Sequence, residues 1–513
     1  MKRTLALFLS VFAVAAILVF WHVGNVADVH AQTNPDWPQW ANTPQHTGAT
    51  SAVGQSPNQQ LADITYDPFT AQEMAESGGD LLAHYQSPLI DGNNVFLEYK
   101  TGTYVSCQPP GSGQPFPCGP DAWNAEIWNE RAFSWQGGSL VESWNFQSDW
   151  KPEPNGGFTG LGGWEPVFHA AISKGFVFVP GASGSVYKLN ESDGTQLAHY
   201  RPFGPVDDPN KFVSGPLTVD HAGNVYYNVI ALDSKHPWTA DVRGAWLVRV
   251  TPQGKFAKVS YSTLVPNAPT TCGGAPCGAQ RPGVNVAPAV SVDGRTIYTA
   301  SRAHFFSEYS YMVAVNANLT PQWQTSLRGL ISPSLAGVIE DLSSSTPAVA
   351  PDGSILYGVL NAIDSRGDLL KFSSSGQYLT KYGFGWDTTP AIYAHDGTYS
   401  VILKDNHYET GGPYFITQLN ASLVPEWQFK NTTIDGRHPN GYEWCANAPA
   451  VDANGTVYAD SEDGSTYVIQ PGGTLQGKLF LRRAVGAAYT PIAIGQDGKI
   501  YTENDGDMFV VGQ

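Results

Sequence analysis

The feature that most constrains this chain is an internal repeat. A small or polar residue and a Pro open a short apolar run. A turn that usually contains Asp-Gly or Asn-Gly follows, and then a run rich in β-branched and aromatic residues. Self-similarity of this kind predicts a repeat architecture in which each copy is one supersecondary unit. Eight copies begin at Ser87, Phe168, Gly215, Ala287, Thr346, Thr389, Ala448 and Thr490, the second with Ala170 in place of Pro.

The repeats have a pattern of four strands, of which the last copy carries only three. The first run is short and contains small residues, as expected for a crowded innermost strand, and the Gly of the turn supplies the positive φ of a tight hairpin. The second run is the next strand. Two further runs follow, such as VYKL and TQLAHY in the second copy. Because four antiparallel strands form one propeller blade, the sequence predicts an all-β fold, an eight-bladed β-propeller.

The ring is predicted to close through the N-terminal part of the chain. The last repeat ends at MFVVGQ, directly after a third strand, so its fourth strand has to come from elsewhere. Residues 60–66 precede the first repeat and alternate like an outer strand. Pairing them with residues 507–511 would remove the sheet edges at the seam. Residues 32–513 are therefore expected to form a single domain.

Residues 1–31 have the pattern of a secretory signal peptide. Lys2 and Arg3 precede an apolar stretch over residues 4–21, and Val29-His30-Ala31 offers small residues at the usual cleavage spacing. We expect export to a periplasmic, extracellular or cell-surface location. The apolar stretch approaches the ~18–20 residues that span a bilayer, so an uncleaved anchor stays open, and only that alternative predicts membrane contact.

Four of the five cysteines form two close pairs in Gly/Pro-rich stretches. Cys107 with Cys118, and Cys272 with Cys277, are expected to be disulfides in an oxidising compartment. Neither pair has the two-residue spacing of a zinc knuckle, and no His completes one, so no metal site is predicted. Cys445 is left as a free thiol.

The charge of the chain argues against a nucleic-acid partner. The net charge is −17, and no basic run occurs after residue 3, whereas phosphate binding needs clustered Lys and Arg. We interpret the charge as a soluble surface and expect a monomer. Long intervals between repeats mark insertions, which in repeat folds map to loops and often to the functional face. They lie near 101–130, 264–284, 302–308, 328–344 and 431–443.

The repeats resemble those of the pyrroloquinoline-quinone (PQQ) dehydrogenase superfamily. In PQQ-type blades an apolar third strand leads through a turn to a fourth strand with a central Trp or Tyr, and the segments GSVYKLNESDGTQLAHY and SLVPEWQF resemble such blades. The segment from Asp36 to Gly48 is similar to the one that opens many PQQ-like repeat proteins. The resemblance covers about residues 36–513 and implies an eight-bladed propeller. The superfamily contains two relevant classes of protein. One class is the periplasmic quinoprotein alcohol dehydrogenases, which use PQQ and Ca²⁺, and the other is non-catalytic scaffolds such as the outer-membrane barrel-assembly lipoprotein.

The chain departs from the dehydrogenases of that superfamily. These need a catalytic Asp, carboxylate and amide ligands for Ca²⁺, and commonly adjacent cysteines, but this chain has no Cys-Cys pair. Trp386-Asp387 is similar to the surroundings of the enzymes' catalytic Asp over two residues only. P-loop, GxSxG and HExxH sequences are also missing. We therefore assign no catalytic residue and expect no cofactor, PQQ and calcium belonging only to the alternative.

The candidate ligand site is formed by the loops that lead into the innermost strands. In a ring these loops converge on one mouth of the central channel, where aromatic rings beside carboxylates suit a sugar, a polyol or a peptide. The alternative is that the Trp residues wedge between blades and the polar residues cap strand ends. The predicted site consists of Trp164, Glu165, Trp386, Asp387, Trp444 and Asn447.

The favoured interpretation is a non-enzymatic, exported binding or scaffold protein for a protein or glycan partner. It rests on the intact ring, the signal sequence and the missing catalytic set. The alternative is a periplasmic PQQ- and Ca²⁺-dependent dehydrogenase of an alcohol or a sugar.

Overall fold

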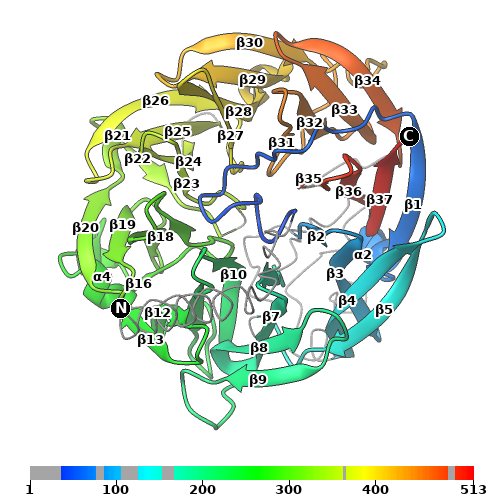
Figure 1. The fold of residues 1–513 in the computed structure, drawn as a ribbon. Coiled ribbons are helices and arrows are strands. Elements are labelled where there is room, and N and C mark those ends of the chain that lie inside the picture. Colours follow the sequence, from blue (N-terminus) through cyan, green and yellow to red (C-terminus); the bar gives the residue numbers. More distant parts are fainter. Residues whose placement is uncertain are drawn as a thin grey trace, which may run out of the picture. The chain divides into compact units, whose positions relative to one another are not determined.

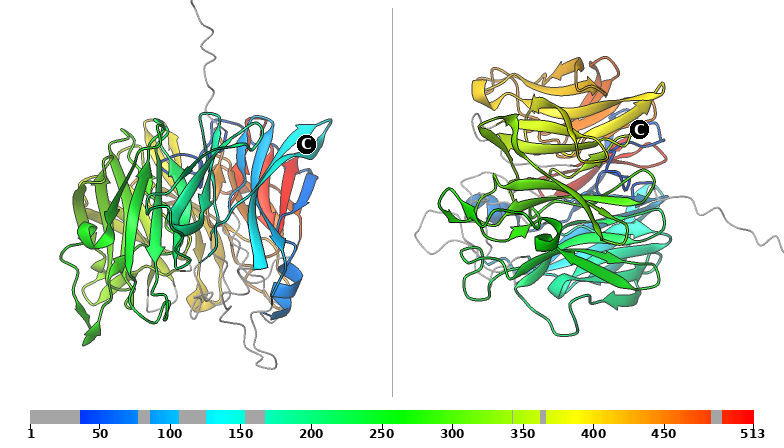
Figure 2. Two further views of the ribbon diagram at one scale, coloured as in Figure 1. Left: turned by 90° about the horizontal axis from the view of Figure 1, so that it is seen from below. Right: turned by 90° about the vertical axis from the view of Figure 1, so that its left-hand side faces the viewer.

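The computed structural model describes residues 36–76, 86–105, 125–152, 167–341, 343–361, 366–482 and 491–513. The compact unit Pro35–Gln513 is an eight-bladed β-propeller, as the sequence predicted (Figure 1). Its four-stranded antiparallel blades are arranged around a central axis, and Figure 2 shows them from two sides. The predicted signal peptide, residues 1–31, lies outside the described residues.

The strands of each blade are given from the innermost to the outermost. Blades 1 to 4 contain β2 (Leu89–Asp91), β3 (Asn94–Gly102), β4 (Glu126–Gln136) and β5 (Ser139–Gln147); β6 (Ala171–Ser173), β7 (Phe176–Gly181), β8 (Ser185–Asn190) and β9 (Gln196–Tyr200); β10 (Lys211–Val219), β11 (Val225–Ala231), β12 (Gly244–Val250) and β13 (Phe256–Ser260); and β17 (Ala289–Val290), β18 (Thr296–Ala303), β19 (Ser310–Asn316) and β20 (Pro321–Ser326).

Blades 5 to 8 contain β23 (Ala348–Val349), β24 (Ile355–Asn361), β25 (Gly367–Phe372) and β26 (Tyr378–Phe384); β27 (Ala391–His395), β28 (Thr398–Asn406), β29 (Tyr414–Asn420) and β30 (Pro425–Lys430); β31 (Ala450–Val451), β32 (Val457–Asp460), β33 (Ser465–Gln470) and β34 (Thr474–Phe480); and β35 (Ala493–Ile494), β36 (Ile500–Asn504), β37 (Asp507–Gly512) and β1 (Gln59–Thr65).

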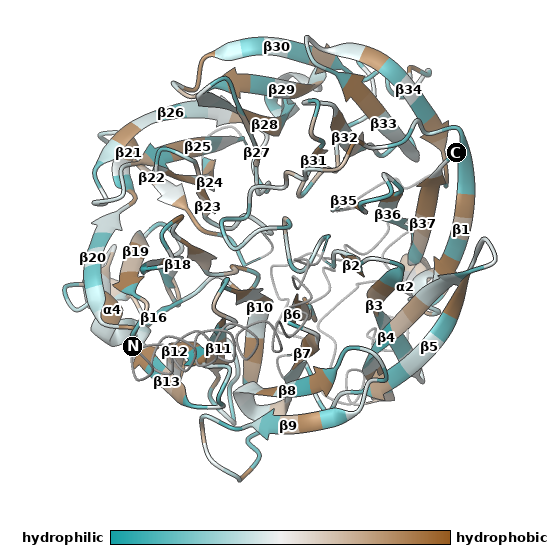
Figure 3. Cartoon of the chain, in the orientation of Figure 1, coloured by the Kyte–Doolittle hydropathy of each residue, from teal (hydrophilic) through white to brown (hydrophobic). Residues whose placement is uncertain are grey.

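Burial follows the order of the strands within a blade. Every residue of β11 and β36 is buried, whereas β34 alternates between exposed and half-buried positions. Figure 3 shows the same contrast, with hydrophilic and hydrophobic residues alternating along the outer strands. The core therefore lies between neighbouring blades; Leu356 and Leu369 of blade 5, for example, pack with Val401 and Leu403 of blade 6.

Aromatic side chains of outer strands join one blade to the next. Trp144 of β5 donates its indole N–H to the carbonyl of Glu191 in blade 2, over 2.8 Å. Its ring covers Gly194 in the same turn, where a Cβ atom would come within 2.7 Å of the indole. Trp323 of β20 covers Gly376 of blade 5 in the same way. These contacts explain why the fourth strands carry a central Trp or Tyr.

The ring closes where the sequence predicted. β1 pairs antiparallel with β37, from Gln59 opposite Gly512 to Thr65 opposite Asp507. Blade 8 thus takes three strands from the C-terminal end of the chain and its outermost strand from the N-terminal part. The predicted seam, residues 60–66 with 507–511, is confirmed.

Residues 36–55, here called the axial segment, run once around the inside of the ring (Figure 1). Each of blades 1 to 7 donates one backbone N–H of its innermost strand to this segment, at an equivalent place in the repeat. The donors and acceptors are Ile90 to Trp37 O, Ile172 to Pro38 O, Val219 to Gln39 Oε1, Val290 to Pro44 O, Val349 to Gln45 O, Ile392 to Thr47 O and Val451 to Gly48 O. The segment therefore satisfies edge groups that would otherwise face the axis unpaired.

Trp40 spans the axis between two opposite blades. Its indole N–H donates to Thr389 Oγ1 of blade 6 over 3.1 Å, and its ring lies edge-on to His169 of blade 2 with 5.8 Å between ring centres. Only 1% of Trp40 is exposed. The axial segment thus fills the middle of the ring at the level where the innermost strands begin.

His46 joins the axial segment to blades 3 and 5. Its Nδ1 lies 2.9 Å from the carbonyl of Pro347, which can only accept, and its Nε2 lies 3.2 Å from Thr218 Oγ1. Nδ1 therefore carries a proton, and in the neutral ring Nε2 accepts from the Thr218 hydroxyl. Complete burial lowers the pKa of His46 to about 4.

Two insertions extend the inner edges of blades 4 and 5, where short strands pair with β18 and β24. The inserted elements are α4 (Tyr261–Leu264), β14 (Thr271–Cys272), β15 (Ala275–Pro276), β16 (Gln280–Arg281), β21 (Arg328–Ser332) and β22 (Leu335–Val338), and the other short helices are α2 (Thr70–Glu76), η1 (Ala182–Gly184) and η2 (Tyr408–Thr410). None of the helices in the described ranges is long and apolar enough to cross a membrane.

The described cysteines behave as predicted. The β14–β15 hairpin carries the disulfide Cys272–Cys277, and Cys445 is a buried free thiol. The other predicted pair, Cys107 and Cys118, lies outside the described residues, so that disulfide stays a prediction.

The seam yields a first prediction. A chain that begins at Tyr66 lacks both β1 and the axial segment, which leaves the edge of β37 and the inner edges of the blades unpaired. We expect this chain to aggregate or to melt well below a chain that begins at Pro35, as followed by circular dichroism and light scattering. Equal melting of the two chains would contradict the role of residues 36–65 in closing the ring.

A second prediction concerns acid stability. Because the pKa of His46 falls from its ordinary 6.5 to about 4 on folding, the unfolded chain binds a proton between these values that the folded chain does not. Lowering the pH from 6.5 to 4 should therefore destabilise the wild type relative to His46→Asn, by on the order of 3 kcal/mol at most. Urea unfolding of both proteins across this range measures the difference, and parallel pH profiles would contradict it.

Candidate ligand site at the mouth of the channel

The residues directly before each innermost strand, here called the lead-in residues, lie at one end of the channel because all eight blades have the same topology. Hydrogen bonds connect the lead-in residues of blades 5, 6 and 7. Ser345 Oγ donates to Thr388 O over 3.1 Å, and the Thr389 N–H donates to Asn447 O over 2.8 Å. The structure therefore brings the predicted site residues Asp387 and Asn447 into one sector of the mouth.

Asp387 is buried at the start of blade 6, with 1% exposure and a left-handed backbone, φ +69°. Its Oδ1 accepts hydrogen bonds from the backbone N–H and the hydroxyl of Ser344 in blade 5. Its Oδ2 has no hydrogen-bond partner among the described residues. Burial raises the pKa of this carboxyl group, and the Lys404 ammonium partly opposes the rise.

Lys404 is a member of this sector that the sequence analysis missed. It lies near the end of β28 and is 1% exposed. Burial raises the pKa values of Glu443 and Cys445 in blade 7, and the positive charge of Lys404 partly opposes both rises, as it does for Asp387. The available signal was a Lys inside an otherwise apolar second strand, YSVILK.

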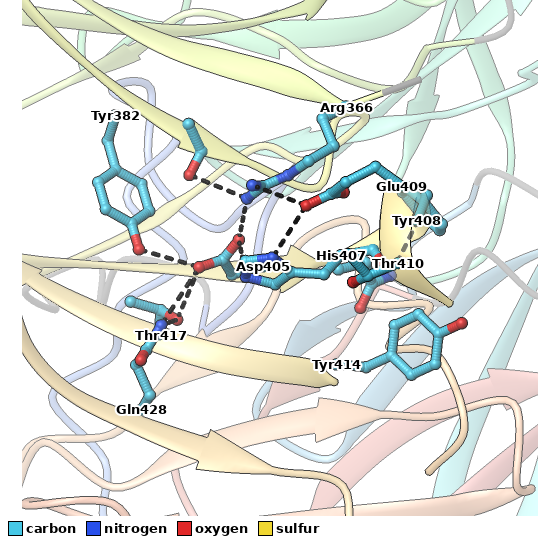
Figure 4. A network of polar contacts seen from close by, with 12 residues as sticks. Arg366, Tyr382, Asp405, His407, Tyr408, Glu409, Thr410, Tyr414, Thr417 and Gln428 are labelled. Carbon is cyan, nitrogen blue, oxygen red and sulfur yellow. Dashed lines mark hydrogen bonds and ion pairs between the residues drawn. The ribbon is translucent and has the colours of Figure 1, made fainter. Parts of the chain in front are cut away.

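The neighbouring residue, Asp405, points to the opposite face of β28. Figure 4 shows its carboxylate between two side chains of blade 5, Arg366 and Tyr382, which donate over 2.6 and 2.9 Å. His407 lies between this carboxylate and Glu409, with Nδ1 3.1 Å from Glu409 Oε1. Asp405 is 1% exposed and has partners on both oxygens. We therefore interpret this network as a structural contact that joins blades 5 and 6.

The two predicted tryptophans of this sector differ. Trp444 is 1% exposed, donates its indole N–H to Tyr414 O over 3.1 Å, and packs against Phe429 and Tyr467 between blades 6 and 7. It therefore presents no free face on which a ligand could stack. Trp386 is half-buried beside Gly367. Trp164 and Glu165 lie outside the described residues, so the proposed grouping of all six residues stays a prediction.

Within the ranges that the structure describes, polar atoms without a hydrogen-bond partner recur among the lead-in residues of five blades. Each of the residues concerned is at most 4% exposed. The atoms are Gln86 Nε2 and Ser87 Oγ of blade 1, His169 Nε2 of blade 2, Asn285 Oδ1 of blade 4, Asp387 Oδ2 of blade 6, and Nδ2 and Oδ1 of Asn447 in blade 7. Gln39 Nε2 of the axial segment is unpartnered as well. Since buried polar groups of folded proteins are almost always hydrogen-bonded, these atoms mark places for water or a polar ligand.

Two arginines and a lysine near the mouth are paired with carboxylates. Asp341, directly before blade 5, accepts a bidentate pair of hydrogen bonds from Arg281, over 2.7 and 2.6 Å, and a third from Arg302 over 3.0 Å. Burial would raise the pKa of Asp341, but the two guanidinium groups outweigh it and hold this pKa low. Lys211 of blade 3 faces Asp208 at 3.5 Å.

The described mouth residues do not fit PQQ and Ca²⁺. Calcium takes six to eight oxygen ligands, yet in the ranges that the structure describes no three His, Cys, Asp or Glu side chains gather in a metal-binding arrangement. Asp387 offers one free oxygen and has the Lys404 ammonium nearby. The carboxylates of PQQ would need free cations, whereas Arg281 and Arg302 are held by Asp341.

A third prediction separates packing from ligand contact. Replacing Trp444 by Ala removes a ring enclosed between two blades and should cost about 3–5 kcal/mol of unfolding free energy. The matched variant Trp386→Ala removes a half-buried ring and should cost clearly less. Chemical denaturation of both variants measures this, and similar losses would contradict the assignment of Trp444 to the core.

The comparisons with known proteins show that the fold of this chain is similar to that of several solved structures. No protein-family model and no curated protein sequence matches the chain. Among solved structures, a europium-containing methanol dehydrogenase matches with a TM-score of 0.55 and 11% identity, over 91% of this chain and 89% of that one. The quinohemoprotein alcohol dehydrogenase from Comamonas testosteroni matches with a TM-score of 0.55 and 11% identity, over 93% of this chain and 81% of that one. The quinohemoprotein alcohol dehydrogenase ADHIIG from Pseudomonas putida HK5 matches with a TM-score of 0.52 and 12% identity, over 93% of this chain and 76% of that one. The chain therefore has the PQQ-like eight-bladed β-propeller fold.

Proposed function

We propose that this chain is a non-enzymatic binding protein whose partner, a glycan or a segment of a protein, occupies the mouth of the channel. The observation that carries the proposal is the set of buried, unpartnered polar atoms on five blades. The topology shared by the blades supports the proposal that these atoms belong to the same end of the channel. A polar ligand would supply the hydrogen bonds that the protein itself does not.

The chemistry of the sector supports binding over dehydrogenation. The carboxylate with a free oxygen, Asp387, has its other oxygen held by Ser344 and lies near Lys404 rather than in a calcium site. The disulfide Cys272–Cys277 supports export to an oxidising compartment. The partner is proposed not to be a nucleic acid, because the chain carries a net charge of −17, and membrane contact is proposed only for a chain whose N-terminal segment stays uncleaved.

Reconstitution tests the proposal against its alternative. The purified protein is incubated with PQQ and Ca²⁺, and quinone absorbance and dye reduction are measured with primary alcohols and sugars. We expect neither stoichiometric quinone binding nor turnover. Stoichiometric binding with turnover that Asp387→Asn abolishes would overturn the proposal and establish a quinoprotein dehydrogenase.

A further inference from the structure

Blade 1 places two glutamates opposite each other inside the ring. We propose that Glu98 and Glu130 form a carboxyl pair that holds a proton at neutral pH and makes the contact between β3 and β4 sensitive to pH. Loss of the proton in alkaline solution puts two like charges side by side and loosens β4 from β3. The proposal concerns the fold and does not depend on the binding function proposed above.

The register of blade 1 brings the two side chains together. β3 and β4 are antiparallel neighbours, and Glu98 is the direct partner of Glu130 in this ladder. Directly opposed side chains lie on the same face of a sheet with their Cβ atoms about 4.5–5.5 Å apart, and like charges in such a pair are destabilising. The sequence nevertheless has a carboxyl group at both positions.

The pair is enclosed by other side chains. Glu130 is only 2% exposed, and Glu98 is half-buried. Trp128 lies two residues before Glu130 and therefore on the same face of β4. Its buried ring packs edge-on against Trp150, with 5.4 Å between ring centres. A carboxylate in such surroundings has to be neutralised by a cation or by a proton.

The described ammonium groups near the pair already serve other acceptors. Lys100 follows Glu98 by two residues on the same face of β3, is buried, and forms an ion pair with Asp67 at 2.5 Å. The same ammonium lies 3.7 Å from a carboxylate oxygen of Glu126. Lys151 donates to the backbone carbonyl of Glu126. Neutralisation of the pair is therefore left to a proton.

The pKa values of the two groups agree with this arrangement. Burial raises the pKa of Glu130 from its ordinary 4.5 to about 8. Burial also raises the pKa of Glu98; the charge of Lys100 opposes this rise, whereas Asp67 and Glu130 add to it. Because each carboxyl group of the pair affects the other, the two take up and release protons as a unit.

Blade 8 and the segment after β1 contribute further titratable groups, none of them a cation. Glu503 of β36 is 1% exposed; burial raises its pKa, and the charges of Glu98 and Asp460 raise it further. Burial likewise raises the pKa of Tyr66, whose phenol therefore stays neutral. These neighbours favour the protonated form of the pair.

The pH dependence of stability tests the proton on Glu130. Between pH 4.5 and about 8 the folded chain holds a proton that the unfolded chain releases, so this group makes the ring less stable as the pH rises through that window. Glu130→Gln keeps the shape of the protonated group without the proton. Its melting temperature should rise relative to that of the wild type across this window and then stay level.

The matched control is Glu142→Gln, the same substitution at an exposed position of β5 in the same blade. Its melting temperature should follow that of the wild type in parallel over the whole pH range. A parallel profile for Glu130→Gln as well would overturn the inference.

Infrared spectroscopy observes the proton directly, because a protonated carboxyl group has a carbonyl stretch that a carboxylate lacks. At neutral pH, the spectrum of the wild type minus that of Glu130→Gln should contain this band, and the band should vanish well above the pKa of Glu130. The difference between the wild type and Glu142→Gln should lack it. A first difference without the band would show that Glu130 is ionised and would overturn the inference.

Amide hydrogen exchange tests the loosening of the strand. After correction for the intrinsic effect of pH, protection of residues 126–136 should fall in the wild type as the pH passes about 8 and should stay level in Glu130→Gln. Level protection in the wild type would overturn the inference. Glu98→Gln replaces Glu130→Gln if that variant does not fold. Failure of both to fold would also overturn it, because Gln reproduces the shape of protonated Glu.

Discussion

The structure depends on how the inner edges of the blades are paired. Stacking strands into radial blades leaves the innermost strand of each blade with an unpaired edge toward the axis, where backbone groups need partners. The axial segment supplies them by accepting one N–H from each of blades 1 to 7, and β1 then closes blade 8. One N-terminal stretch thus completes both the inside and the outside of the ring, which couples all eight blades to it.

The axial segment also shapes the candidate site. Trp40 and His46 fill the axis with an indole and a neutral imidazole, which form hydrogen bonds with blades 3, 5 and 6 and a ring contact with blade 2. The lead-in residues then stand around a filled centre rather than around an open passage. Several of their buried polar atoms have no hydrogen-bond partner among the described residues. An enclosed set of hydrogen-bonding groups is therefore a property of the ring as a whole.

How far the site could be predicted differs from residue to residue. The sequence analysis named Asp387 and Asn447 as site residues because their position before an innermost strand defines the end of the channel to which they belong, and their role in binding stays a prediction. Trp444 occupies the same kind of position, yet its ring turns between blades 6 and 7, since position in a repeat does not define the direction of a side chain. Lys404, His46 and His169 were missed because each acts through groups that are distant in sequence.

By itself, the sequence determined the number of blades, the strand order and the closing strand, because strand periodicity and Gly-containing turns are local and recur eight times. It also determined which cysteines pair within the described β14–β15 hairpin. Only the tertiary structure decided that residues 36–55 circle the channel, that Asp341 holds two arginines, and that Asn406 is satisfied while Asn447 is not. The reason is that each of these features depends on contacts between different blades, and the distances between blades are set by packing around the whole ring rather than by any one repeat.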